Sequence, residues 1–195
     1  TGVQFAESDT DDVISPSLVL HPTESESIYA SDMAYASNGI NKDKVMDIAD
    51  SVYVSGRKTK ISDGAKAYVK LSLSDFEGGS AAFSFTTDSN SCGKLWVYGI
   101  KDKDECANWS SKTINYTNAP ANERTSDSAV DLKKVYGESA IASYDVNGQK
   151  TYSADITEYA NYMKASGADY ITLVFATDSR ESKTVFYENF ESAEL

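Results

Sequence analysis

Four side chains have the chemistry of a sugar-binding surface: Tyr68, Lys70, Trp96 and Tyr98. Apolar residues alternate with others in 66–73 and in 95–98, so we expect each pair to lie on one side of a strand, facing away from the core. Sugars present apolar C–H faces ringed by hydroxyl groups, and aromatic rings beside a lysine offer both stacking area and hydrogen bonds. We therefore expect all four to face solvent, with Trp96 as the main stacking residue.

Alternatives stay open for three of these residues. Either Tyr68 and Tyr98 form the surface, or the N-terminal segment or loops cover them. Lys70 either pairs with an acidic polysaccharide or is an ordinary surface lysine whose ammonium group reaches water. Trp109 is a separate case, because we expect it to anchor a loop and therefore to be buried with its indole N–H paired.

The 30 Asp and Glu residues are candidates for two further kinds of site. A glycosidase needs only two carboxyl groups flanking a cleft. Calcium needs several oxygen ligands, which the turn with Asp102, Asp104 and Glu105 offers. Most acidic residues fall in turns and charged loops, where hydration explains them. We expect no required cofactor, leave structural Ca²⁺ open, and assign no metal ligands.

Most catalytic templates lack their parts. His21 is the only histidine, lies near the expected tail and precedes Pro22, so we interpret it as an ordinary surface residue and expect neither a serine-hydrolase triad nor a histidine-rich metal site. The chain also has no glycine-rich phosphate loop and no His-Glu-x-x-His motif. We expect no catalytic residues and a protein that is not an enzyme.

Cys92 and Cys106 are the only cysteines. A disulfide between them would suit a secreted protein. If 94–100 is a strand, however, Cys92 lies at its start and Cys106 near its end, which at about 3.3 Å per residue separates them by roughly 20 Å. We favour two free thiols, and a bridge stays the alternative.

The elements that position these residues are mainly strands. Short runs rich in Val, Leu, Tyr and Phe predict strands at 18–20, 51–54, 66–73, 82–85, 95–98, 170–175 and 184–187. Phe83 and Phe85 are expected on the core side of their strand. These strands outnumber any helical pattern in the chain.

One short helix is expected. Asp155 to Glu158 has the spacing of a capping box, and Gly167 provides a stop. Between them, apolar residues recur at helical intervals: Ile156, Tyr159, Ala160 and Met163.

The whole chain is short and acidic. Its 195 residues suit a single unit over 17–195, and residues 1–16 are interpreted as an acidic tail or linker remnant. A net charge of −12 argues against nucleic acid and anionic membranes as partners. No apolar run approaches the roughly 18 residues that cross a bilayer.

Several motifs occur in an order that resembles a known family. They are Ala49 to Val54, Ala67 to Leu73, Trp109 with Asn115 to Pro120, Asp155 to Thr157, and Tyr187-Glu188. Together they resemble the DNRLRE-type domains, a group of secreted bacterial β-sandwiches that includes carbohydrate-binding modules of the alginate-binding kind. That family commonly has an acidic residue two positions after the tryptophan, where this chain has Ser111. The segment Ser17 to Asp47 is additional here, and we expect it to add strands or to cover one sheet.

The resemblance implies an all-β, antiparallel, jelly-roll-like sandwich with one short helix, in a secreted or cell-surface protein. It also implies a non-catalytic carbohydrate-binding module. Such a module holds a tethered catalytic or scaffold domain, as in a cellulosome, near plant or algal polysaccharide. The alternative is a structural or adhesive scaffold-associated domain that binds no glycan, in which case Trp96 is covered.

Overall fold

Antiparallel strands make up most of the structure. The computed structural model describes residues 17–21, 26–46, 51–56, 64–123, 130–177 and 183–187. Within these residues the chain forms ten strands, and all of their pairings are antiparallel. The expected all-β, sandwich-like fold is confirmed. The expected acidic tail, residues 1–16, lies outside the described part of the chain.

The strands are β1 (Ser17–His21), β2 (Glu26–Ser37), β3 (Ser51–Ser55), β4 (Ala65–Ser72), β5 (Ser80–Thr87), β6 (Cys92–Gly99), β7 (Ala142–Asn147), β8 (Lys150–Asp155), β9 (Tyr170–Ala176) and β10 (Lys183–Tyr187). All seven predicted strands occur. The sequence did not predict β2, β7 or β8. The additional N-terminal segment supplies β1 and β2, so the expectation that it adds strands is confirmed.

The strands form two sheets that share the long strand β2. In the first sheet β2, β4, β9, β6 and β7 lie side by side in that order. In the second sheet the order is β2, β1, β5 and β8. The first half of β2 pairs with β1 and the second half with β4, with an irregularity between Ala30 and Asp32 where the partner changes. β3 and β10 pair with each other and touch both sheets.

Aromatic side chains from both sheets meet in the core. Phe83 and Phe85 of β5 contact Phe175 of β9 with ring centres 5.8 and 5.3 Å apart. Phe85 also stacks on Tyr152 of β8 at 5.5 Å. Each such pair contributes about 0.5–1.5 kcal/mol beyond the area it buries. The expected core positions of Phe83 and Phe85 are confirmed.

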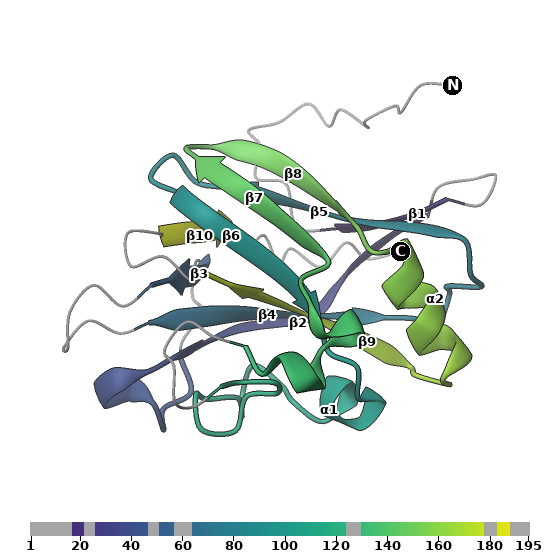
Figure 1. The fold of residues 1–195 in the computed structure, drawn as a ribbon, viewed down its shortest axis with the longest axis horizontal. Coiled ribbons are helices and arrows are strands. Elements are labelled where there is room, and N and C mark those ends of the chain that lie inside the picture. The colour runs from purple at the N-terminus through teal and green to yellow at the C-terminus, as the bar shows by residue number, and fades with distance from the viewer. Residues whose placement is uncertain are drawn as a thin grey trace.

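The expected helix is α2 (Thr157–Ala165), which lies at one end of the strands (Figure 1). Its buried face is the predicted one, and Gly167 follows it with a φ of 74°, a left-handed conformation that suits glycine. The predicted capping box is wrong. The Asp155 carboxylate accepts a hydrogen bond from Thr157 N at 2.9 Å, and the capping residue, Ile156, has no side-chain cap.

A second helix was not predicted, so the expectation of one helix is wrong. This helix is α1 (Lys103–Ala107), and three 3₁₀ turns occur besides it: η1 (Gly39–Asn41), η2 (Leu132–Lys134) and η3 (Tyr136–Glu138). α1 begins at Asp102, whose carboxylate accepts from Asp104 N and Glu105 N. In the described ranges no helix has both the length and the apolar character needed to cross a membrane.

A third layer covers part of the first sheet. Residues 101–123 and 130–138, called here the covering layer, include α1, η2 and η3 and lie over the side of β4 and β9 that faces away from the second sheet (Figure 1). Apolar side chains of this layer are buried against the strands: Trp109, Ile114, Tyr116 and Val135. β4 is therefore buried on both faces.

Candidate functional site

The four predicted sugar-binding residues lie on one face of the first sheet. Tyr68 on β4 pairs with Val174 on β9, and Val174 pairs with Tyr98 on β6. Paired residues of antiparallel strands point to the same side of a sheet, and so do residues two apart on a strand. Lys70 and Trp96 therefore share the face of Tyr68 and Tyr98.

The expectation that Tyr68 and Lys70 face solvent is wrong. Tyr68 is 0% exposed and Lys70 is 7% exposed. The covering layer buries both, and Trp109 packs edge-on against Tyr68 with ring centres 6.1 Å apart. Burial raises the pKa of Tyr68 well above its ordinary value, with the charges of Tyr116 and Glu105 acting in the same direction. A polysaccharide in solution cannot stack on either residue in this conformation.

Lys70 instead ties the covering layer to β4. Its Nζ donates to Ala107 O at 2.9 Å and to Trp109 O, and lies 4.8 Å from the centre of the Trp109 ring. These groups replace the water that the ammonium group loses on burial. Burial lowers the pKa of Lys70, and the charge of Asp32 on β2 opposes this shift.

Trp109 has the structural role expected of it. Its side chain is buried, and the indole N–H donates to Thr172 Oγ1 on β9 at 2.9 Å. Ser111, the residue that departs from the family pattern, donates its backbone N–H to Asp32 Oδ2 at 3.0 Å. A carboxylate does reach this turn, but it comes from β2.

Trp96 remains accessible in part. It is half-buried, and the Lys94 Nζ lies 5.4 Å from its ring centre and 3.4 Å from Asp145 Oδ1. β7 places Ser143 opposite Trp96 and Asp145 opposite Lys94. Lys94, Trp96, Ser143 and Asp145 are called here the β6–β7 patch. Tyr98 is also half-buried, and it packs against the hydrophobic core.

The β6–β7 patch has groups that can bind a polar ligand. Ser143 is exposed, and the Asp145 side chain is 89% exposed, so a hydroxyl group and a carboxylate are open to solvent. Lys94 adds a cation and Trp96 adds an aromatic surface. Together they offer stacking, hydrogen-bond donors and hydrogen-bond acceptors within two neighbouring strands.

The acidic turn considered for calcium begins α1. Asp102 Oδ1 accepts from Asp104 N at 2.8 Å and from Glu105 N at 3.1 Å, and Glu105 Oε1 lies 2.5 Å from Lys134 Nζ. In the part of the chain that the structure describes, no group of three or more His, Cys, Asp or Glu side chains lies close enough together to hold a metal ion. Structural calcium stays a prediction to be tested with a chelator.

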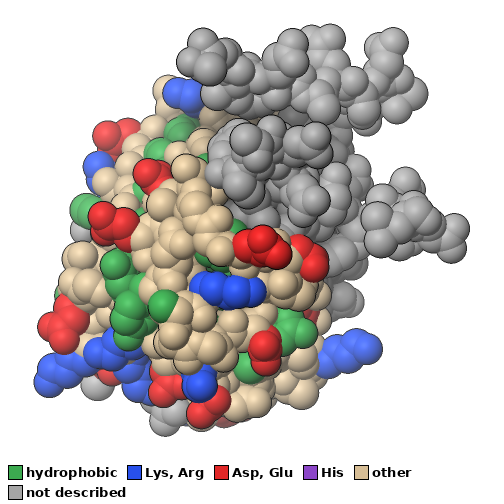
Figure 2. Space-filling view, turned by 90° about the vertical axis from the view of Figure 1, so that its right-hand side faces the viewer, with side chains coloured by type: hydrophobic (Ala, Val, Ile, Leu, Met, Phe, Trp, Pro, Cys, Tyr) green, Lys and Arg blue, Asp and Glu red, His purple; other side chains and the backbone are tan. Residues whose placement is uncertain are grey.

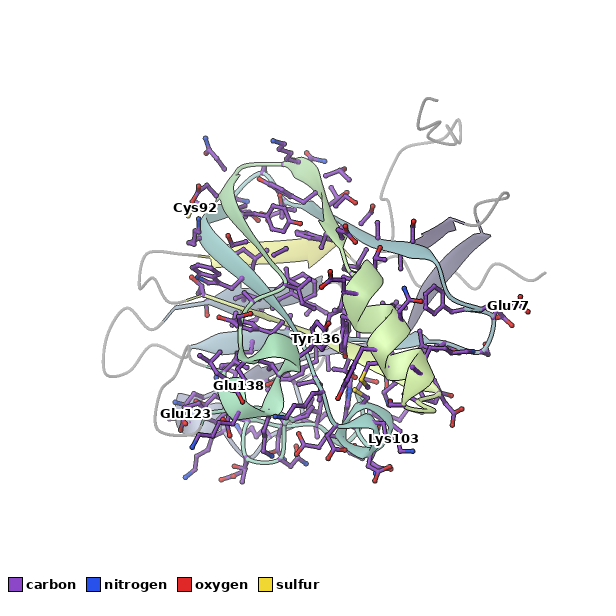
Figure 3. The ribbon with its side chains drawn as sticks, turned by 45° about the vertical axis from the view of Figure 1, so that its right-hand side comes forward. Glu77, Cys92, Lys103, Glu123, Tyr136 and Glu138 are labelled. Atoms are coloured by element: carbon purple, nitrogen blue, oxygen red, sulfur yellow. The ribbon has the colours of Figure 1, made fainter. Side chains whose placement is uncertain are left out.

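Neither cysteine forms a disulfide, as the geometry of the strand favoured. Cys92 is exposed at the start of β6, and Cys106 is buried in α1. Figure 3 shows Cys92 at the end of β6 that lies away from α1, where Lys103 is labelled. The alternative of a disulfide is wrong.

A second group of aromatic side chains was not singled out from the sequence. Tyr162 on α2 is 47% exposed, and its ring centre lies 5.1 Å from that of Tyr136 in η3. Figure 3 shows Tyr136 beside α2, and Figure 2 shows that this side of the molecule mixes apolar side chains with charges of both signs. The outward position of Tyr162 in the helical pattern was the available signal.

Comparisons with known proteins do not assign this chain to a family. No protein-family model matches this chain, and no curated protein matches it.

Proposed function

We propose that this protein is a non-catalytic carbohydrate-binding module that uses the β6–β7 patch. In this proposal it is secreted, belongs to the DNRLRE-type group of bacterial β-sandwiches, and holds a tethered enzyme or scaffold, such as a cellulosome, near plant or algal polysaccharide. Tethering raises the effective concentration of the enzyme at its substrate without any chemistry in the module.

The observation that carries the proposal is the partly exposed Trp96 beside exposed polar groups. Lys94, Ser143 and Asp145 lie around it on two paired strands. A large aromatic side chain at the surface of a strand pair is a natural receptor for the apolar face of a sugar ring. The sandwich-like fold and the order of the family motifs support the same assignment. Tyr68 and Lys70 no longer contribute to it, because both are buried.

Lys94 has a specific part in this proposal. Its ammonium group occupies space over the Trp96 ring, where a sugar would stack. Stacking therefore requires the lysine side chain to rotate away, which breaks its ion pair with the exposed Asp145 carboxylate, now at 3.4 Å. An exposed pair of this kind is worth little, about 0–1 kcal/mol, so the rotation is inexpensive.

The deciding experiment is affinity electrophoresis against soluble plant and algal polysaccharides, with and without a calcium chelator. We expect one class of polymer to retard the protein. Replacing Trp96 with Ala should abolish most of that retardation and leave the melting temperature nearly unchanged, because the ring is only half-buried. Loss of retardation with the chelator would place a metal in the site or the fold.

The matched control is Tyr162→Ala, which removes an exposed aromatic ring from α2, away from the patch. It should keep full retardation. Equal retardation of the Trp96→Ala protein would refute the assignment of the patch. Failure of every polysaccharide to retard the native protein would favour the alternative function, a structural or adhesive scaffold-associated domain. The observation that favours this alternative is the partial covering of Trp96 by Lys94.

A further inference from the structure

A second buried lysine lies four residues before Lys70, on the same face of β4. Lys66 is 0% exposed, and its Nζ lies 2.6 Å from the side-chain carbonyl oxygen of Asn122 in the covering layer. The two residues are 56 positions apart in the chain. The Lys66 Nζ also lies 4.9 Å from the centre of the Tyr116 ring. A fully buried amine and a half-buried carboxamide are thus held together.

The side-chain amide of Asn122 is fixed from both ends. Its Nδ2 donates to Tyr116 O at 2.5 Å, while its Oδ1 accepts from Lys66. The residue before it, Ala121, has a φ of 47°, an unusual conformation for a residue other than glycine. Such backbone strain persists only where the surroundings hold it in place. The covering layer therefore presents the Asn122 amide to Lys66 in one orientation.

Lys66 and Lys70 differ in what they face. Lys70 donates to backbone carbonyls, where attack by the amine would have to break the main chain. Lys66 faces a side-chain carboxamide, which can release ammonia. Burial removes the water that stabilises an ammonium group and so favours a neutral, nucleophilic amine. The hydrogen bond brings the two side chains together, which removes part of the entropic barrier to their reaction, and the amine must turn from Oδ1 toward Cγ to react.

We propose that Lys66 and Asn122 form an intramolecular amide cross-link. The Nζ lone pair attacks Cγ of Asn122, the Nζ–Cγ bond forms, and the Cγ–Nδ2 bond breaks. A proton from Nζ passes to Nδ2, which leaves as ammonia, so no oxidant or other reactant is consumed. We assign the transfer of that proton to Glu105, whose Oε2 accepts from Ala121 N at 3.4 Å, one residue before Asn122, while its Oε1 pairs with Lys134. The product joins β4 covalently to the covering layer.

The test is the intact mass of the wild-type chain under denaturing conditions. A cross-linked chain is lighter than its sequence mass by about 17 Da, the mass of one ammonia molecule. After trypsin digestion, we expect a branched peptide that contains Lys66 and Asn122, with no cleavage after Lys66. The sequence mass, with the two residues in separate linear peptides, would overturn the proposal and leave the pair as a hydrogen bond.

Two controls separate this bond from other losses of ammonia. Asn38-Gly39 and Asn147-Gly148 can also lose ammonia, by forming a cyclic imide. A mass loss of about 17 Da with linear peptides only would therefore also overturn the proposal. Lys66→Arg should restore the sequence mass, whereas the matched variant Lys70→Arg should keep the loss. Should either variant fail to fold, the wild-type peptide map still decides. The cross-linked protein should also have a higher melting temperature than Lys66→Arg.

Discussion

At the scale of single residues, the covered face of β4 shows how a polar strand surface becomes part of a core. Lys66 and Lys70 are both buried, and the side-chain nitrogen of each meets an oxygen atom and an aromatic ring from the covering layer. At Lys70, an unpaired charge would cost several kcal/mol, about 3–5 kcal/mol for a broken buried pair. These lysines therefore fix where the covering layer lies on the sheet.

The two cysteines provide a direct test of the described arrangement. Cys92 is exposed, whereas Cys106 is buried and burial raises its pKa to about 11. Because the thiolate is the reactive form, a thiol reagent should label Cys92 and spare Cys106 in the native protein. Mass spectrometry should find one label per native chain and two per denatured chain. Cys92→Ser should remove the native label, and two labels on the native chain would contradict the burial of Cys106.

The same thiol makes folding stability depend on alkaline pH. The pKa of Cys106 is 9.0 ordinarily and about 11 in the fold, with burial as its main cause. Between these values the folded state holds a proton that the unfolded state has released, so stability falls as pH rises through this window. The full effect is about 3 kcal/mol. Urea unfolding at a series of pH values should show a shallower fall for Cys106→Ala than for wild type.

The control for this pH profile is Cys92→Ala, which removes the exposed thiol and should keep the wild-type slope. Burial also raises the pKa values of Tyr68 and Tyr159, and both tyrosines titrate in every variant. The difference between the two cysteine variants measures Cys106 together with its coupling to Tyr159, whose pKa the Cys106 charge and hydrogen bond also raise. Parallel profiles for wild type and Cys106→Ala would contradict the assignment.

At the scale of elements, α2 is held against the end of β6 by one ring. Tyr159 is buried, and its hydroxyl group donates to Ile100 O at 2.7 Å. A methyl group on Gly99 would meet three atoms of this ring at 2.6 to 2.8 Å, closer than side chains tolerate. The glycine therefore makes room for α2 to close this end of the sandwich.

Gly99→Ala should destabilise the protein by about 1–3 kcal/mol, as overpacking of a core does. Chemical denaturation would measure the change. Tyr159→Leu removes the ring that the methyl group meets, so Gly99→Ala should cost much less in that background, and the two effects should not add. Additive effects would show that α2 is not held by this contact.

The elements also show how far the sequence determines the fold. α2 was predictable because Tyr159 and Met163 lie on one helical face, and β4 because its residues alternate. β2 was not predictable, since its Ser, Ala and Asp residues are poor strand formers, and its pairing with two different strands compensates for this.

The candidate site was predictable only in part, for a related reason. Alternation correctly placed Tyr68 and Trp96 on one face of the sheet, because strand geometry alone decides it. Alternation does not say which part of that face a distant segment will cover. The covering layer begins more than thirty positions after Tyr68, and only tertiary contacts such as Trp109 to Thr172 place it.

At the scale of the whole molecule, net charge sets which polysaccharides can approach the β6–β7 patch. The chain carries a net charge of −12, while the patch itself contributes one lysine and one aspartate. Salt screens charges beyond a Debye length of about 10 Å at 0.1 M ionic strength. It therefore weakens the long-range repulsion of an anionic polymer more than the close contacts at Trp96.

Two different salt dependences follow, one for neutral and one for anionic polysaccharides. Affinity for a neutral polysaccharide, such as a β-glucan, should be unchanged between low and moderate salt, because stacking and neutral hydrogen bonds dominate it. Affinity for an anionic polysaccharide, such as alginate, should rise over the same range as the repulsion is screened. Isothermal titration at several salt concentrations would measure both. If salt instead weakened alginate binding, a cationic surface would have to dominate recognition. Lys94→Gln would tell whether that surface is the β6–β7 patch, because Lys94 is the lysine of the patch. In that case the variant would lose the salt dependence.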